Sequence, residues 1–174
     1  MEWTGARYAD KPTVEVRTRI DAPPRQVWRL VSDIRLMPAL SAELQSVQWL
    51  DGAAGPALGA RFVGSSRHEA LGEWETTSYI VEWEPYRVFA WAVADPEHPS
   101  SVWRFSLEAA DGGTELTQWM QMGPGRSGLS FAIDRMPEKE QKIVFVRLRE
   151  FERSMAGTVD AIRKMAEGAE GAGA

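Results

Sequence analysis

Three polar side chains, His68, Ser66 and Gln118, are the residues of this chain best suited to chemistry. Imidazole titrates near neutral pH, so His68 is a candidate general base. Ser66 shares a face with His68 if the chain is extended there, because side chains alternate along a strand. Gln118 carries an amide that must find hydrogen-bond partners if it is buried. His68 and Gln118 are therefore the candidate catalytic residues, for proton transfer or for orienting a bound molecule.

A complete catalytic or metal-binding set is not evident. His68 needs an acidic partner, and Glu69, Glu73 and Glu75 are close to it only in sequence, so an ordinary histidine near a strand end is the stronger interpretation. The chain has two histidines and no cysteine. His98 falls in an expected exposed loop, with no second ligand at helical or strand spacing. The sequence therefore predicts no metal site and no thiol nucleophile.

One glycine-rich segment has the spacing of a phosphate-binding motif. Residues 123–128 (GPGRSG) match G-x-G-x-x-G and follow an expected strand. That chemistry requires a parallel βαβ unit with an acidic residue at the end of its second strand, whereas only a helical pattern follows here. Ser127 also lacks the glycine spacing of a nucleophile elbow. We therefore expect a flexible loop and no cofactor.

The elements that must position these residues are mainly strands. Residues 14–20 alternate apolar and charged side chains, which indicates a half-buried strand. Helical spacing follows to Ile34, and a short second helical turn is expected to about Glu43. The later connectors are mostly too short for a crossover helix, so neighbouring strands should pair antiparallel. Six further strands are expected at 44–50, 60–68, 74–84, 88–94, 102–109 and 114–122.

The C-terminal part is expected to be one long helix. Residues 123–134 have irregular composition and predict a turn or a short apolar lid. Pro137 suits the first turn of the helix that follows. An apolar stripe then runs to about Ala166, and 167–174 are expected to fray. The stripe comprises Val144, Leu148, Phe151, Met155, Val159 and Ile162.

These patterns together predict a single α+β domain over residues 1–174, with its core at about 13–166. A curved antiparallel sheet of about seven strands should wrap around the long C-terminal helix, because each has an apolar face to bury. One or two short helices should follow the first strand.

Several short segments carry a family resemblance: IDAP at 20–23, VW at 27–28, LGARF at 58–62, EPYRV at 84–88 and GGTELT at 112–117. In this order, over about residues 13–166, they resemble the START/Bet v 1-like superfamily, also called the polyketide cyclase/dehydrase and lipid-transport group. The resemblance implies a helix-grip fold with an internal cavity. It does not fix the chemistry, because one fold serves many ligands.

Strand alternation assigns broad aromatic side chains and a few polar ones to the inner face of the sheet, the usual composition of an apolar-ligand pocket. Trp91 and Trp103 are expected either to stack on a flat ligand or to fill the core. A ligand, the backbone or water would satisfy Gln118. The expected ligand-binding residues are Phe62, Ser66, Trp74, Thr76, Trp91, Trp103, Gln118, Met120, Phe151 and Met155.

Two main functions follow as hypotheses. The first is non-catalytic binding of an apolar or aromatic small molecule, lipid-like or polyketide-like. The second, implied by the resemblance, is a polyketide cyclase or aromatase acting in the same cavity, with Ser66, His68 and Gln118 as its polar groups. A module that passes ligand occupancy to a partner protein is a third, and an uncovered apolar patch around Phe145 would favour it.

The composition of the chain argues against some classes of binding partner. A net charge of −5 without basic runs argues against nucleic acid. No apolar stretch approaches the length of a membrane span, so stable membrane insertion is not expected. The first residues lack a signal-peptide pattern, which favours a cytoplasmic location. Trp3 and Tyr8 precede the first strand and are expected to pack on their own sheet or on a second copy in a homodimer.

Overall fold

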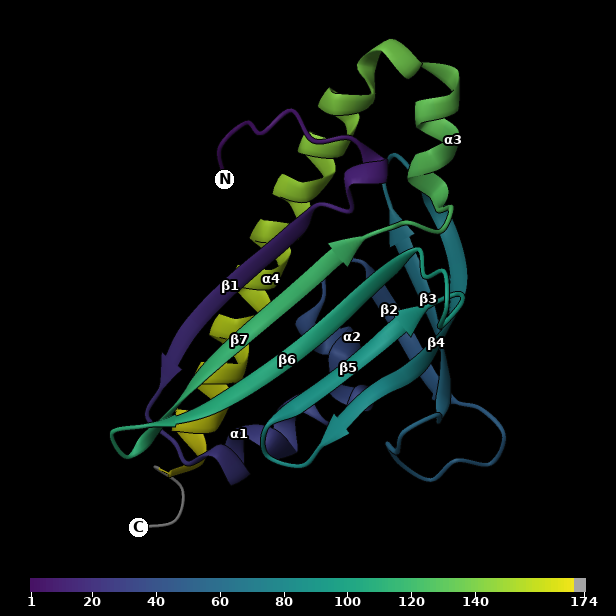
Figure 1. Cartoon of the computed structure of the whole chain (residues 1–174). Coiled ribbons are helices and arrows are strands. Elements are labelled where there is room, and N and C mark those ends of the chain that lie inside the picture. The colour runs from purple at the N-terminus through teal and green to yellow at the C-terminus, as the bar shows by residue number, and fades with distance from the viewer. Residues whose placement is uncertain (171–174) are drawn as a thin grey trace.

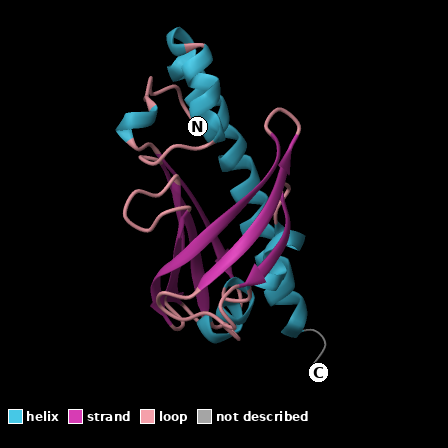
Figure 2. Cartoon of the chain, turned by 90° about the vertical axis from the view of Figure 1, so that its right-hand side faces the viewer, coloured by secondary structure: helices cyan, strands magenta, loops and turns pink. Residues whose placement is uncertain are grey.

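Seven strands form one antiparallel sheet in the computed structural model, which describes residues 1–170, and their order across the sheet is β1-β7-β6-β5-β4-β3-β2 (Figure 1). The sheet curves around one long helix, as the side view shows (Figure 2). This confirms the predicted α+β helix-grip architecture. The strands are β1 (Thr13–Ile20), β2 (Leu44–Trp49), β3 (Arg61–His68), β4 (Gly72–Glu84), β5 (Val88–Val93), β6 (Ser101–Ala110) and β7 (Gly113–Met122).

The strands form a simple meander from β2 to β7, and β1 joins its end by pairing with a strand that is distant in sequence. Strands β2 to β7 each pair with their neighbour in sequence, because the connecting turns are short. Strand β1 instead pairs with β7, in a register that runs from Thr13 opposite Gln121 to Ile20 opposite Thr114. A register shift in β4 between Ile80 and Glu82 changes the side-chain alternation there.

The helices lie at the two ends of the sheet and along its inner face (Figure 1). The helix α4 packs along β1, and its predicted stripe is buried at Val144, Leu148, Met155, Val159 and Ile162. The helical segments are η1 (Tyr8–Asp10), α1 (Pro24–Val31), η2 (Ile34–Leu36), α2 (Met37–Leu40), α3 (Gly128–Arg135), η3 (Pro137–Lys139) and α4 (Glu140–Glu170).

Two expectations about the C-terminal part need correction. The segment expected to be irregular contains the helix α3, whose first turn is closed where the Ser127 amide donates to Ser130 Oγ at 3.0 Å. The helix α4 continues to Glu170, past the predicted end at Ala166. The rest of the predicted frayed tail, residues 171–174, lies outside the described residues.

The glycine-rich loop before α3 is anchored by close packing. The Gly125 amide donates to the Pro99 carbonyl at 2.8 Å, and the Tyr8 hydroxyl donates to the Gly125 carbonyl at 2.6 Å. A Cβ atom on Gly125 would lie 2.1 Å from the His98 carbonyl oxygen, so only glycine fits. Because every strand pair of the described sheet is antiparallel, this loop is not the phosphate loop of a βαβ unit.

The N-terminal segment packs on its own chain. The Trp3 ring contacts the Phe145 ring edge-on, with centroids 5.1 Å apart. The Met1 amino group pairs with Glu152 at 3.1 Å. The apolar patch around Phe145, which if uncovered would favour a module that contacts a partner protein, is therefore covered in part by Trp3. Within residues 1–170, no helix is long and apolar enough to cross a membrane.

Two clusters of buried side chains hold the sheet and helices together. One surrounds α1 and includes Trp28, Phe89 and Ile162. The other lies where α4 crosses the ends of β1 and β7, and includes Met120 and Leu148. Both clusters contribute side chains to the space between the sheet and α4.

Candidate functional site

A cavity of about 500 Å³ lies between the inner face of the sheet and α4. Its wall combines side chains of β3 to β7 with those of α2, α3 and α4. All the residues predicted to bind a ligand line this cavity, and their role in binding stays a prediction. They are Phe62, Ser66, Trp74, Thr76, Trp91, Trp103, Gln118, Met120, Phe151 and Met155.

The tryptophans fill part of the core and also face the cavity. Trp91 is 9% exposed, and its ring centroid is 6.2 Å from that of Phe62. Trp103 packs edge-on against Phe151 of α4, with centroids 5.3 Å apart. Its indole N–H donates to Ser101 Oγ at 3.0 Å. The polar atom of this tryptophan is thus satisfied within the wall, and its ring remains as apolar lining.

Gln118 is a polar side chain of the cavity whose hydrogen-bonding capacity is not fully used. It lies in the middle of β7, opposite Val16 on one side and Phe105 on the other, and is 6% exposed. Among the described residues, its Oε1 atom is buried without a hydrogen-bond partner. A buried carbonyl in that state costs about 1–3 kcal/mol, so a donor placed in the cavity would be bound favourably.

The cavity opens to solvent beside α3. Arg126 and Phe131 contribute to its lining although their side chains are exposed, Phe131 by 66%. Hydroxyl groups of Ser66, Thr76 and Ser78 line the wall formed by β3 and β4. The cavity is therefore mostly apolar, with a few uncharged polar groups on its sheet side.

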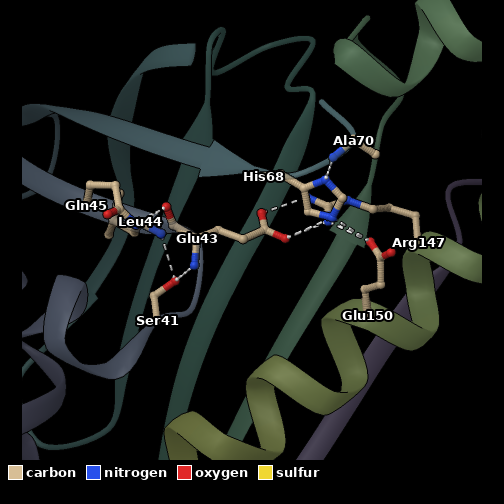
Figure 3. A network of polar contacts seen from close by, with 8 residues as sticks. All are labelled: Ser41, Glu43, Leu44, Gln45, His68, Ala70, Arg147 and Glu150. Carbon is tan, nitrogen blue, oxygen red and sulfur yellow. Dashed lines mark hydrogen bonds and ion pairs between the residues drawn. The ribbon is translucent and has the colours of Figure 1, made fainter. Parts of the chain in front are cut away.

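A charged cluster forms one wall of the cavity around Arg147 (Figure 3). Arg147 lies on α4 and donates to both oxygens of Glu43, at 2.6 and 2.8 Å. It also donates to Glu150 at 2.8 Å, and its guanidinium carbon lies 4.2 Å from the centre of the Phe151 ring. Burial opposes the charged form and is the largest single effect. The two carboxylates together outweigh it, so the pKa of Arg147 lies above its ordinary value.

His68 stands on the outer side of this cluster and does not line the cavity. Its Nδ1 accepts a hydrogen bond from the Ala70 amide at 3.1 Å. Its Nε2 lies 3.3 Å from a Glu150 oxygen and 4.0 Å from Glu43. With Nδ1 as acceptor, the proton of the neutral ring is assigned to Nε2. Both nitrogens are thus engaged in polar contacts (Figure 3), and His68 is not among the residues that line the cavity.

The acidic partners of His68 are not those nearest in sequence. Glu69, Glu73 and Glu75 are exposed, while Glu43 and Glu150 come from a loop and from α4. Sequence reasoning missed this set because its members are far apart along the chain. Arg147 had one local signal, since it is three residues after Val144 and four before Phe151 on the apolar stripe.

The same cluster meets the distance requirement of a metal site but not its chemistry. Ligand atoms of Glu43, His68 and Glu150 lie within 4.8 Å of one another. However, Arg147 already occupies the carboxylate oxygens as their cation. A metal bound at Nε2 also needs the ring proton on Nδ1, where the Ala70 amide donates instead. The arrangement fits an internal ion pair better than a bound metal.

Comparison with known proteins identifies the family. The sequence matches the family described as polyketide cyclase / dehydrase and lipid transport over residues 11–150. The chain belongs to this family. No curated protein sequence matches the chain significantly.

Several solved structures are similar to this member of the polyketide cyclase / dehydrase family, and some of them are aromatase/cyclases. A polyketide-cyclase-like protein from Corynebacterium glutamicum is 32% identical, with 89% of this chain and 91% of that chain covered and a TM-score of 0.65. An aromatase/cyclase from Streptomyces sp. R1128 is 16% identical over 90% of this chain and 93% of that chain, with a TM-score of 0.61. A di-domain aromatase/cyclase from the steffimycin biosynthetic pathway is 11% identical over 91% of this chain and 51% of that chain, with a TM-score of 0.69. The last two likenesses show the fold alone.

Proposed function

We propose that this protein binds an apolar or aromatic small molecule, lipid-like or polyketide-like, in the cavity between the sheet and α4. The observation that carries the proposal is the unpartnered Oε1 of Gln118 inside a mostly apolar cavity of about 500 Å³. Apolar burial would supply most of the affinity, and one hydrogen bond to Gln118 would orient the ligand. The preferred ligand accordingly carries a hydroxyl or N–H group on an apolar body.

The position of His68 favours binding over catalysis. A general base must reach the proton that it removes, and His68 is separated from the cavity with both ring nitrogens engaged. Arg147, Glu43 and Glu150 are already engaged with one another in ion pairs within the wall. The polar groups that remain on the cavity side are hydroxyls and an amide, which hold a ligand more readily than they transfer its protons.

A matched pair of variants on β4 tests the proposal. Thr76 lines the cavity, whereas Thr77, its neighbour, lies on the opposite face of the strand. We expect Thr76→Phe to fill the cavity and weaken binding of the fluorescent probe N-phenylnaphthylamine about tenfold or more, and Thr77→Phe to leave binding unchanged. Native mass spectrometry of the purified protein would identify any molecule retained in the cavity. A probe that does not bind, or that binds Thr76→Phe as well as the wild type, would overturn the proposal.

Polyketide-cyclase-like activity is the second candidate. The observation that favours it is the set of hydroxyl side chains on β3 and β4 that line the same cavity as Gln118. Such groups could assist enolisation of a poly-β-keto chain that the cavity folds, with proximity supplying much of the acceleration. The test is turnover of a poly-β-keto thioester mimic by the wild type and by Ser66→Ala and Gln118→Ala. Turnover equal in all three proteins would remove these assignments.

A further inference from the structure

A second pocket of about 490 Å³ lies outside the cavity, between α3, the first turns of α4 and the β3–β4 turn. We call it the outer pocket. It shares Leu71, Leu129 and Arg147 with the cavity, so the two spaces adjoin at these side chains. Its apolar lining comprises Ala70, Leu71, Leu129, Ala132, Met136, Ile143 and Val146.

The cations that line the two spaces fall into two kinds. Arg126 is paired with Asp134, and Arg147 with Glu43 and Glu150. Lys139 and Lys142 line the outer pocket, and within residues 1–170 neither forms an ion pair. The Lys139 ammonium instead lies 3.8 Å from Met136 Sδ. The outer pocket thus has two lysines without an ion-pair partner among the described residues. Its acidic lining residue, Glu150, is paired with Arg147 and lies beside His68.

The charged residues that line the two spaces favour different chemical groups in each of them. A negatively charged group that moved into the cavity would meet the carboxylate of Glu43 and would find no unpaired cation among the described cavity residues. An apolar group would instead meet Leu71 and Leu129, which border both spaces. An anion is therefore favoured in the outer pocket and an apolar body in the cavity.

We propose that the outer pocket binds the anionic end of an amphiphile whose apolar part lies in the cavity. The ligand class is thereby a carboxylate or similar anion attached to an apolar chain or ring system. This inference rests on the proposed function, because the apolar part needs the cavity. Lys139 and Lys142 hold the anion, and the aliphatic side chains around them exclude water from the chain next to it.

The test compares a fluorescent fatty acid, cis-parinaric acid, with its uncharged methyl ester. Exposed ion pairs contribute modestly, so removing both lysines in Lys139→Gln/Lys142→Gln should weaken binding of the acid about fivefold to tenfold. Binding of the ester should not change. Lys164→Gln is the control, because Lys164 is on α4 like Lys142 but pairs with Asp160 and lines neither pocket.

The outcomes separate the two proposals. If the acid and the ester bind the wild type equally, and the lysine substitutions do not change binding of the acid, this inference is overturned. Ligand binding in the cavity would still stand. An equal loss for acid and ester would also overturn it, since that result indicates a damaged pocket. If neither probe binds the wild type, this inference and the proposed function both fail. A selective loss of acid binding, reduced at high salt, supports the inference.

Discussion

Replacing Gln118 by leucine tests the link between the cavity and its one unsatisfied polar atom. Leucine has a similar size and suits the apolar neighbours Val16 and Phe105. Because Oε1 lacks a partner among the described residues, removing it should relieve a desolvation cost of about 1–3 kcal/mol. We expect the free energy of unfolding without ligand to rise by about 1–2 kcal/mol, and Tm by about 2–8 °C for a domain of this size.

The same substitution should weaken binding of ligands that carry a donor. A net hydrogen bond contributes about 0.5–1.5 kcal/mol, so N-phenylnaphthylamine, which has an N–H group, should bind Gln118→Leu about twofold to tenfold more weakly. Its N-methylated analogue has no such donor and should bind both proteins alike. The measurements are urea unfolding of the ligand-free protein and fluorescence titration with each probe.

Gln121→Leu is the control for these measurements, because Gln121 is on the same strand but not on the cavity face. Its substitution should change neither the free energy of unfolding nor probe binding by more than about 0.5 kcal/mol. The reasoning is refuted if Gln118→Leu is less stable than the wild type without ligand. That result would mean that ordered water already satisfies Oε1, so the amide would be a structural group and not a binding group.

Three further predictions concern the charged wall of the cavity, the stability of the fold at low pH, and the N-terminal segment. Arg147→Ala should lower the free energy of unfolding by about 1–3 kcal/mol in urea, because two partly buried carboxylates lose their cation. Hydrogen bonds from Arg35 hold the pKa of Asp33 below its usual value, so this carboxylate stabilises the fold above about pH 4. That contribution is lost as the pH falls through the lower folded value, and Asp33→Asn should remove this part of the pH dependence of urea unfolding. Tyr8→Phe removes the 2.6 Å hydrogen bond to the Gly125 carbonyl and should speed hydrogen exchange of the α3 amides without unfolding β1.

The strands were predictable because local patterns determine them. In β5, Phe89 and Trp91 alternate with small side chains, and the flanking turns have ordinary turn residues. The inner-face assignments of β5, β6 and β7 follow directly from that alternation. The register shift in β4 does not, since a bulge has no strong sequence signal. It places Trp83 on the inner side, 5.0 Å from the ring centre of Trp28.

The helix α3 and the charged cluster could not be predicted from the same patterns, for different reasons. Glycine and proline in 123–128 mask a helix start, although Ser127 followed by Ser130 was a capping signal. Glu43 and Arg147 are 104 residues apart, so their pairing depends on how the finished sheet curves toward α4. The apolar lining of the site was therefore accessible from sequence, and its charged wall was not.

The pairing of β1 with β7 has a consequence for how the chain is made. These strands are separated by about a hundred residues, and such distant contacts slow folding. On a ribosome, β1 has no partner until β7 emerges, and α4, which covers the inner face, is synthesised after both. The aromatic lining thus has no cover from α4 until that helix has been synthesised. A nascent chain of this protein should depend on chaperones most strongly in that interval, and an apolar molecule nearby can be enclosed as α4 docks.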